Sequence, residues 1–334
     1  MAQGDREAAA ALDLVDYHTP LLLRLCIDAG VIAAFGRDER SLSDVAAATG
    51  THVGTLERVV RALESRGVFE RGEPTRFRLT DIGRRFLPDE PGNLSGFASF
   101  RSWELHAWAE AEFTLRTGRP AFLHHFGRKY WDWLADHPGV ASKFNAGMRK
   151  RTAALLDVAL PLFEWPARGT VVDVGGGNGQ LLARVLTDRS DLRGIVFDLP
   201  QGVAEASPLL EAAGVADRVD VVAGNFFEAI PTGHDLYILA SVLHDWDDTQ
   251  AARILECCRR AMPPSGRLLL FESVLASSAE ADLGKLVDLH MLVLFGGRER
   301  SREQWQALLA GAGFTIHRIV PTPALHWIEA RPAP

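Results

Sequence analysis

The sequence is poor in cysteine and in long apolar runs. Its three cysteines, Cys26, Cys257 and Cys258, have neither the spacing of a CxxC metal site nor the even number typical of a disulfide framework. We therefore expect free thiols in a reducing compartment. No run approaches the roughly 20 apolar residues that span a bilayer, and residues 1–13 lack the apolar segment of a secretory signal. These absences predict a cytoplasmic protein with no membrane partner.

An excess of charge of one sign is also missing. The 36 basic and 43 acidic residues give a formal net charge of -7, which does not favour a protein that neutralises phosphates over a broad surface. Apolar residues at 47% and charged residues at 24% are ordinary values, and they exclude disorder, collagen-like repeats and coiled coil as descriptions of the whole chain. At about 150 residues per domain, the length of 334 residues predicts two domains.

Residues 1–100 have the outline of a helical, winged-helix-like domain. Apolar residues recur every three or four positions over residues 8–34, which predicts amphipathic helices. Over residues 40–88, two short helices joined by a turn at Gly50 precede two alternating runs on either side of Gly72, which predict a hairpin. The amphipathic helices offer more apolar surface than so small a module can bury, so we expect a homodimer.

A winged helix raises the alternative of a DNA-binding regulator. Residues 41–88 contain eight Arg, no Lys and six acidic residues, and this net charge of about +2 is a weak footprint for a nucleic-acid-binding domain. Arg58 and Arg61 share their helix with Glu57 and Glu64, whereas a recognition helix concentrates basic residues on one face. We therefore favour packing or dimerisation, with no nucleic-acid partner.

The remainder of the chain divides into a helical, aromatic-rich connector over residues 101–165 and a domain over residues 166–334. In the second part, short apolar runs alternate with helical segments. This alternation predicts an α/β fold with a doubly wound, mostly parallel Rossmann-like sheet. The expected strands are residues 170–174, 194–198, 219–223, 235–240, 267–272 and 314–319. Ligands of such sheets bind at the carboxyl ends of the strands.

The first expected strand ends in a glycine-rich turn. Gly175 and Gly177 allow a ligand to approach the backbone closely, and Asp198 ends the next strand 23 residues after Gly175. A carboxylate at that place can accept hydrogen bonds from both hydroxyls of a ribose. Asn225 and Phe226 follow the third strand, where an amide can bind an adenine edge and an aromatic ring can pack on its face. To this point NAD and S-adenosylmethionine fit about equally, and core packing explains Phe226 equally well.

The fourth strand leads into the sequence His244-Asp245-Trp246-Asp247-Asp248. With this motif the chain resembles the S-adenosylmethionine-dependent small-molecule O-methyltransferases, the family of plant phenolic methyltransferases and bacterial antibiotic and phenazine tailoring enzymes. The other segments that carry the resemblance are Val171–Gly179, Phe197–Pro200, Gly224–Phe227, Cys258–Met262 and Gly296–Arg300. The resemblance covers the whole chain, because that family has an N-terminal winged-helix-like dimerisation domain. It implies S-adenosyl-L-methionine as cofactor, a small aromatic acceptor and a homodimer.

The resemblance also implies roles for individual residues. His244 matches the general base, and Glu272 and Glu299 match the two acids that flank it. The implied cofactor-binding residues are Gly175, Gly177, Asp198, Leu199, Asn225, Phe226 and Ser241. The implied acceptor-binding residues are Phe144, Asn145, Met148, His290 and Met291. No metal is implied. Plant relatives often have a basic residue where this chain has Ala240, so a cofactor contact of that kind is not expected here.

The chemistry of a histidine base agrees with this interpretation. A phenol with a pKa of about 10 must lose its proton near neutral pH, and a histidine with the ordinary pKa of about 6.5 is largely neutral there. A carboxylate on the far ring nitrogen fixes the tautomer. A phenol and an N-hydroxy heteroaromatic such as a phenazine share this requirement, so both acceptors stay open. An NAD-dependent oxidoreductase is the alternative from another enzyme class, and helix capping is the structural alternative for His244.

Overall fold

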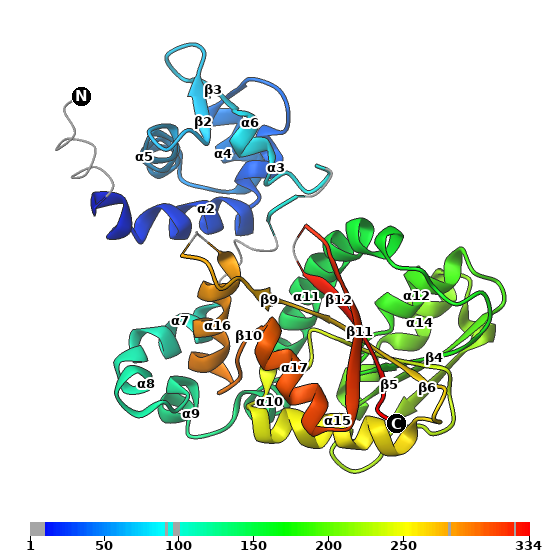
Figure 1. The fold of residues 1–334 in the computed structure, drawn as a ribbon. Coiled ribbons are helices and arrows are strands. Elements are labelled where there is room, and N and C mark those ends of the chain that lie inside the picture. The colour runs from blue at the N-terminus through cyan, green and yellow to red at the C-terminus, as the bar shows by residue number, and fades with distance from the viewer. Residues whose placement is uncertain (1–10, 91–92, 96–100, 280–281, 324) are drawn as a thin grey trace. The chain divides into compact units, whose positions relative to one another are not determined.

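The computed structural model describes residues 11–90, 93–95, 101–279, 282–323 and 325–334. The chain forms two compact units, Met1–Arg101 and Ser102–Pro334 (Figure 1). In the helix α11 (Pro138–Ala159) the backbone is described throughout, but several side chains, including that of Asn145, are not. Each unit has its own hydrophobic core, so each is described separately below.

Over the described residues the first unit has the expected helices and hairpin, while residues 8–10 of the expected helical segment lie outside them. Its sheet has the order β1-β3-β2 and is antiparallel. Ser41 caps α4 by accepting a hydrogen bond from the Asp44 backbone N–H, and Gly50 ends that helix at a φ of 67°. Phe35, Phe69 and Phe77 lie in its core. The elements are α2 (His18–Asp28), α3 (Val31–Phe35), β1 (Arg40–Ser41), α4 (Leu42–Thr49), α5 (Val53–Glu64), β2 (Phe69–Arg71), β3 (Arg76–Leu79) and α6 (Asp81–Arg84).

The second unit contains a seven-stranded sheet of order β11-β12-β8-β7-β4-β5-β6. Its parallel strands are β4 (Gly169–Val174), β5 (Leu192–Asp198), β6 (Val219–Ala223), β7 (Leu236–Ala240) and β8 (Arg267–Glu272). One face is covered by α15 (Asp248–Ala261) and α17 (Arg302–Gly311), and the other by α11 (Pro138–Ala159), α12 (Gln180–Thr187) and α14 (Ala206–Ala212) (Figure 1). The doubly wound fold predicted from the sequence is confirmed.

The strand β12 (His326–Pro332) was not expected from the sequence. It pairs antiparallel with both β11 (Phe314–Pro321) and β8. Glu329 interrupts its apolar pattern, yet this side chain is buried and accepts hydrogen bonds from Arg267 and Arg318, each at 2.8 Å. A buried charge is tolerated only when it is paired in this way, and the sequence alone does not reveal the two partners.

A helical layer precedes the sheet in the chain and packs against α16 (Leu283–Leu294). Its members are α7 (Ser102–Ala109), α8 (Ala111–Thr117), α9 (Ala121–Phe126) and α10 (Tyr130–Ala135). Phe122, Tyr130 and Phe144 lie in the aromatic core of this layer. Within the described part of the chain, no helix is long and apolar enough to cross a membrane.

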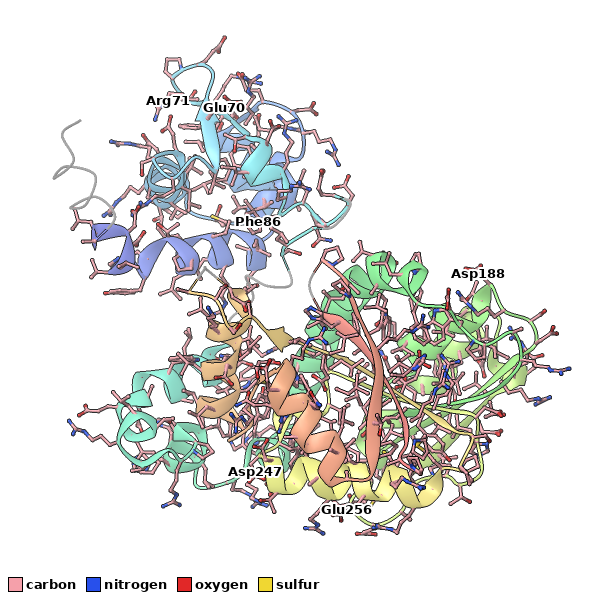
Figure 2. All side chains as sticks on the ribbon, viewed as in Figure 1. Glu70, Arg71, Phe86, Asp188, Asp247 and Glu256 are labelled. Atoms are coloured by element: carbon pink, nitrogen blue, oxygen red, sulfur yellow. The ribbon has the colours of Figure 1, made fainter. Side chains whose placement is uncertain are left out.

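The start of α15 and a short strand pair, β9 (Val274–Leu275) and β10 (Arg300–Ser301), lie near the ends of the central strands. The helix α15 begins after Asp247, whose side chain caps it by accepting a hydrogen bond from the Gln250 backbone N–H. Figure 2 shows Asp247 at this end of α15 and Glu256 farther along the same helix. The strands β9 and β10 form a separate parallel pair, which brings the segment after α16 next to the end of β8.

Candidate active site

Three of the sequence-predicted residues, His244, Glu272 and Glu299, meet at one edge of the sheet. His244 lies in the 3-10 turn Leu243–Asp245 just after β7, and Glu272 is the last residue of the neighbouring β8. Glu299 directly precedes β10. The His244 Nδ1 atom lies 2.8 Å from Glu299 Oε1 and 3.9 Å from Glu272 Oε2. All three side chains are buried, so the sheet edge assembles a shielded imidazole and two carboxyl groups.

Glu272 also holds the backbone of the turn that carries His244. Its Oε1 atom accepts hydrogen bonds from the backbone N–H groups of Val242, at 3.0 Å, and Leu243, at 2.8 Å. Within the described residues, Glu272 Oε2 and Glu299 Oε2 are buried without a hydrogen-bond partner. Both carboxyl groups therefore retain an unused oxygen beside the imidazole.

The electrostatics of the trio favour the imidazolium. Burial opposes the charged form of His244, but Glu299, Glu272 and Asp245 outweigh it and raise the pKa of His244 to about 10. Burial raises the pKa of Glu272 to about 7. The expectation of a histidine with an ordinary pKa, largely neutral near pH 7, is therefore wrong for the free protein. The cause is that neighbouring carboxyl groups surround this ring.

The glycine-rich turn and Asp198 form a second cluster at the same edge of the sheet. Gly177 adopts a φ of 54°, a conformation that favours glycine, and its N–H donates to Asp198 Oδ2 at 2.9 Å. The Leu199 N–H donates to Asp198 Oδ1 at 2.6 Å. A Cβ atom on Gly175 would lie 2.8 Å from Val242 Cγ2. Since Val242 precedes His244 by two residues, the glycine-rich turn adjoins the turn that carries His244.

Asp173 is a residue of this cluster that the sequence analysis did not single out. Asp173 lies in β4, two residues before Gly175, and its side chain is buried. Its Oδ2 atom has no hydrogen-bond partner within the described residues. Burial and the charge of Asp198 raise the pKa of Asp173 to about 7. Two acids beside a glycine-rich turn suit a ligand that carries ribose hydroxyls and positive charge. S-adenosylmethionine has both features, so the donor set fits it.

Asn225, Phe226 and an unexpected tryptophan lie beyond β6. Asn225 Oδ1 accepts a hydrogen bond from the Phe227 N–H at 3.0 Å, and its Nδ2 donates to Glu228 Oε1 at 3.1 Å. The rings of Phe226 and Phe227 stand almost perpendicular to that of Trp246, at interplanar angles of 87° and 86°. Trp246 was missed as a site candidate, although its place in the motif after His244 was the available signal.

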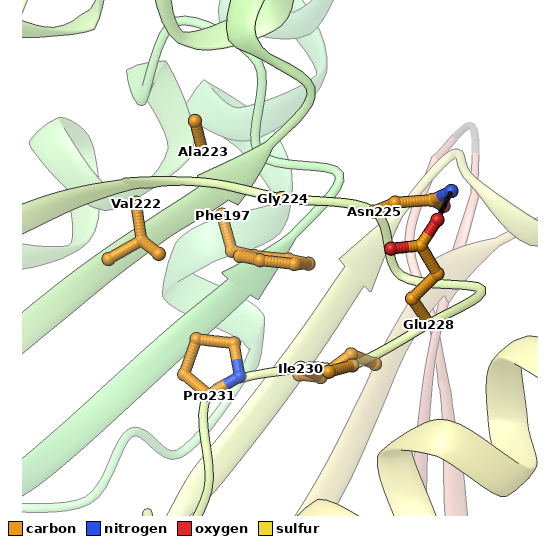
Figure 3. A pocket seen from close by; sticks show the side chains of 9 residues that line it. Phe197, Val222, Ala223, Gly224, Asn225, Glu228, Ile230 and Pro231 are labelled. Carbon is orange, nitrogen blue, oxygen red and sulfur yellow. Dashed lines mark hydrogen bonds between the residues drawn. The ribbon is translucent and has the colours of Figure 1, made fainter.

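A hollow of about 440 Å³ opens beside Asn225. It is lined by Phe197 from β5 and by residues of β6 and the following loop, including Ile230 and Pro231. Figure 3 shows Asn225 and Glu228 hydrogen-bonded to each other at its rim and the Phe197 ring inside it. The hollow therefore combines an apolar interior with a polar edge, at the carboxyl ends of β5 and β6.

Ser241 occupies a strained position between β7 and the His244 turn. Its φ is 54°, and among the described residues no other non-glycine residue has a positive φ. Its backbone N–H donates to the Phe271 carbonyl at 3.0 Å. Residues held in this region of backbone conformation concentrate at functional sites. Neither Ala240 nor Ser241 offers a cation to a ligand.

The candidate acceptor residues are divided between two places. Phe144 is buried and meets Trp131 edge-on at an angle of 84°, while Trp131 stacks on Phe295 with ring centroids 5.4 Å apart. Met148 packs against this aromatic cluster. Met291 is buried on α16. The Asn145 side chain lies outside the described residues.

His290 forms a different contact. Its Nδ1 atom accepts a hydrogen bond from the Trp108 indole N–H at 2.9 Å, and the two rings are nearly parallel. Because Nδ1 accepts here, the ring proton of a neutral His290 belongs on Nε2. The structure thus places His290 of α16 against Trp108 of α7.

Comparison with known proteins identifies the family. Residues 108–315 match a model described as "O-methyltransferase domain", and residues 12–89 match one described as "O-methyltransferase dimerisation domain". The chain belongs to the O-methyltransferase family. The resemblance stated from sequence motifs is thereby confirmed. Members of this family act with S-adenosylmethionine, and the protein is an S-adenosylmethionine-dependent O-methyltransferase.

Several relatives of this O-methyltransferase cover nearly its whole length. It is 35% identical over 340 residues to the phenazine O-methyltransferase PhzM of Lysobacter antibioticus, covering 99% of this chain and 100% of the relative. It is 39% identical over 311 residues to the O-demethylpuromycin-O-methyltransferase of Streptomyces alboniger, covering 89% and 81%. Among solved structures, CalO1, a methyltransferase in calicheamicin biosynthesis bound to SAH, aligns with a TM-score of 0.85 and 31% identity over 100% of both chains. These matches favour the methyltransferase over the oxidoreductase and the DNA-binding regulator.

Proposed function

We propose that this enzyme moves a methyl group from S-adenosylmethionine to a hydroxyl group of an aromatic secondary metabolite, with His244 as the general base. The observation that carries the proposal is the buried 2.8 Å contact between His244 Nδ1 and Glu299. This contact commits Nδ1 to a carboxyl group. We assign the acceptor hydroxyl to Nε2, which lies 3.5 Å from Asp245 Oδ1 in the free protein. The glycine-rich turn adjoins the same backbone segment through Val242, so the residues that would hold the cofactor lie next to the turn that carries the base.

Proton transfer in this site is matched to a phenolic acceptor. The bound cofactor supplies an electrophilic methyl group on a sulfonium centre. Neutral His244 accepts the hydroxyl proton as the oxygen attacks, and Glu299 and Glu272 stabilise the resulting imidazolium. A phenol has a pKa of about 10. The carboxyl groups around His244 raise its pKa above the ordinary value, which strengthens the imidazole as the acceptor of a phenolic proton.

The nature of the acceptor follows from the aromatic cluster. Trp131, Phe144 and Phe295 present flat apolar surfaces, which suit a planar ring system. We assign residues 101–165 to the acceptor pocket and residues 166–334 to catalysis, with Phe144, Asn145, Met148, His290 and Met291 as acceptor-binding residues. The named relatives act on a phenazine and on O-demethylpuromycin, which supports an aromatic hydroxyl and keeps an N-hydroxy heteroaromatic such as a phenazine as the alternative.

The test of this function is a mass-spectrometric screen. Purified enzyme is incubated with S-adenosylmethionine and a panel of aromatic hydroxy acids, polycyclic phenols and N-hydroxyphenazines, and products heavier by one methyl group are scored. His244→Ala serves as the matched control. Methylation that depends on His244 supports the proposal. Equal methylation by His244→Ala would refute the general-base role.

We assign the cofactor to the residues at the ends of β4 to β7. The acids Asp198 and Asp173 face a glycine-rich turn, and the proposal adds Asp173 and Trp246 to the residues expected from the sequence. The sequence-predicted cofactor residues are Gly175, Gly177, Asp198, Leu199, Asn225, Phe226 and Ser241. Calorimetric titration with S-adenosylmethionine tests them, with NADH as the comparison ligand. Binding of NADH without binding of S-adenosylmethionine would contradict the assignment.

We further propose a cytoplasmic homodimer. Leu12, Leu14, Val15 and Tyr17 lie at the start of the segment that matches the dimerisation domain, and each is more than half exposed in the single chain. Apolar surface of this kind is normally covered by a partner. The three cysteines are free and buried, in keeping with a reducing compartment. Light scattering is expected to give the mass of two chains at micromolar concentration, and a monomer would contradict the proposal.

A further inference from the structure

Arg300 is a fully buried cation next to the catalytic trio, and the sequence analysis assigned it no role. It follows Glu299 directly and begins β10. Its Nη1 atom donates to the Leu243 carbonyl at 3.0 Å, and its Nη2 atom donates to the Trp246 carbonyl at 2.9 Å. These two carbonyl groups stand on either side of His244. One guanidinium thus holds both ends of the turn that carries the base.

Backbone groups next to Arg300 also contact the turn that carries His244. The Arg298 backbone N–H donates to the His244 carbonyl at 2.9 Å. A Cβ atom on Gly297 would overlap that same carbonyl oxygen, so the chain passes as close to the turn as a backbone can. Residues 297–300 therefore fix His244 from one side, and the same segment supplies Glu299. The base and its carboxylate are held by a single piece of chain.

The hydrogen-bond partners of Arg300 indicate positioning rather than charge neutralisation. Among the described residues its ionic partner is Asp248, whose Oδ1 atom lies 2.9 Å from Nε and whose side chain is 56% exposed. The ion pair alone would leave Nη1 and Nη2 free. Both instead donate to neutral carbonyl groups, and Nη1 also reaches the Arg298 carbonyl at 3.4 Å. With Asp248, the planar fork reaches four acceptors in fixed directions. The Trp305 ring lies 5.1 Å from the guanidinium carbon and limits its movement.

We propose that Arg300 is a positioning residue for methyl transfer: by joining the Leu243 and Trp246 carbonyls to the Glu299 segment, it sets the place of the His244 ring relative to Glu299 and to the acceptor. The inference rests on the proposed role of His244. Arginine alone provides the three-way fork. Lysine keeps the charge and loses the geometry, so the two effects can be separated by substitution.

The test compares Arg300→Lys with wild type and with Arg267→Lys. Arg267 pairs with buried Glu329 at the other end of β8, so the control alters a half-buried arginine far along the strand from the trio. A misplacement of about 1 Å can cost about 100-fold in rate. We expect Arg300→Lys to lower kcat by about 100-fold, with the Kd of S-adenosylmethionine and the acceptor KM within about threefold of wild type. Arg267→Lys is expected to keep kcat within about threefold.

Two further readouts separate positioning from folding stability. An NMR titration of the His244 ring in Arg300→Lys is expected to give a pKa shifted from that of wild type toward the ordinary value of about 6.5, since the contact with Glu299 loosens. Free guanidinium is expected to restore activity to Arg300→Ala. Folded Arg300→Lys with wild-type kcat and an unchanged His244 titration would overturn the proposal. So would a loss of kcat that only follows the loss of folded protein. If His244→Ala also retains activity, the proposed general base fails instead.

Discussion

The Nδ1 atom of His244 and the Oε1 atom of Glu299 lie 2.8 Å apart in the protein interior. This contact joins a turn after β7 to a segment that lies 55 residues farther along the chain. It occupies Nδ1 of the ring. Burial lowers the pKa of His244, and the charge of Glu299 is the largest of the effects that raise it. The first two predictions below follow from it.

Removing either His244 or the charge of Glu299 should slow the chemical step. We expect His244→Ala to lower kcat by about 100- to 10,000-fold, the range of general-base catalysis. Glu299→Gln keeps the hydrogen bond but loses the charge that stabilises the imidazolium, so a smaller loss of about 10- to 100-fold is expected. Single-turnover kinetics with saturating S-adenosylmethionine measures both. Glu303→Gln, on the exposed start of α17, is the control and should not change the rate. A Glu299→Gln enzyme as fast as wild type would contradict the role of Glu299.

The value of kcat/KM should increase as the pH rises into the alkaline range. His244 acts as a base only when neutral, and its pKa is raised from 6.5 to about 10 in the free enzyme, so kcat/KM should increase with pH until about pH 10. Glu299→Gln removes a group that raises this pKa and should move the midpoint to lower pH. A phenolic acceptor with a pKa of about 10 titrates in the same range, so its ionisation is measured separately by absorbance and taken into account in the profile. A midpoint near 6.5 in wild type would show that the carboxyl groups do not act on the ring.

Gly297→Ala should damage the active site more than the fold. Its Cβ atom would overlap the His244 carbonyl oxygen, so the turn must shift, and we expect at least a tenfold loss of kcat. Overpacking of this kind costs about 1–3 kcal/mol in the free energy of unfolding. Gly311→Ala is the matched control, because nothing lies within 4 Å of its Cβ position in α17. It should be neutral or stabilise by about 0.5–1 kcal/mol. Urea unfolding and steady-state kinetics check both variants.

Asp198→Asn should weaken cofactor binding. A hydrogen bond to a charged group contributes about 1.5–3 kcal/mol, so the Kd of S-adenosylmethionine should rise by about 10- to 150-fold in calorimetric titration. Asp220→Asn on β6 is the control, because that side chain is exposed on the next strand. An unchanged Kd in Asp198→Asn would remove Asp198 from the cofactor site.

Ser241→Gly should relieve backbone strain. A non-glycine residue at a positive φ costs of the order of 1 kcal/mol, and glycine adopts the φ of 54° without that cost. We expect the free energy of unfolding to stay equal or to increase by up to about 1 kcal/mol, whereas Ser241→Val should lower it by about 1–3 kcal/mol. Denaturant unfolding distinguishes them. Equal stability of the glycine and valine variants would contradict the strain.

The sequence predicted the parts of this fold that repeat in a regular pattern. The alternation of strands and helices predicted β4 to β8, and the rule that ligands bind at the carboxyl ends of such strands directed attention to Asp198 and His244. The strand β12 was missed because buried Glu329 breaks its apolar pattern. The two arginines that donate hydrogen bonds to Glu329 come from β8 and β11. No sequence pattern near β12 predicts these hydrogen bonds.

The candidate site likewise has residues that could be predicted from the sequence and features that could not. Motifs predicted His244, Glu272 and Glu299, and the structure brings them together. The raised pKa of His244 and the grip of Arg300 were not predictable, because both depend on burial and on contacts between segments more than 50 residues apart in the chain. Asp173 was missed because an acid inside a buried strand is normally avoided, and only the structure shows its unpartnered oxygen beside the glycine-rich turn.

The high proton affinity of His244 has a kinetic consequence for each catalytic cycle. Every methyl transfer leaves one proton on the imidazole. The neighbouring carboxyl groups raise the pKa of His244, and a group with a higher pKa releases its proton to water more slowly. Small buffer bases that reach the ring should therefore accelerate steady-state turnover without changing the single-turnover rate. The steady-state rate should then depend on the concentration of such bases in the surrounding solution.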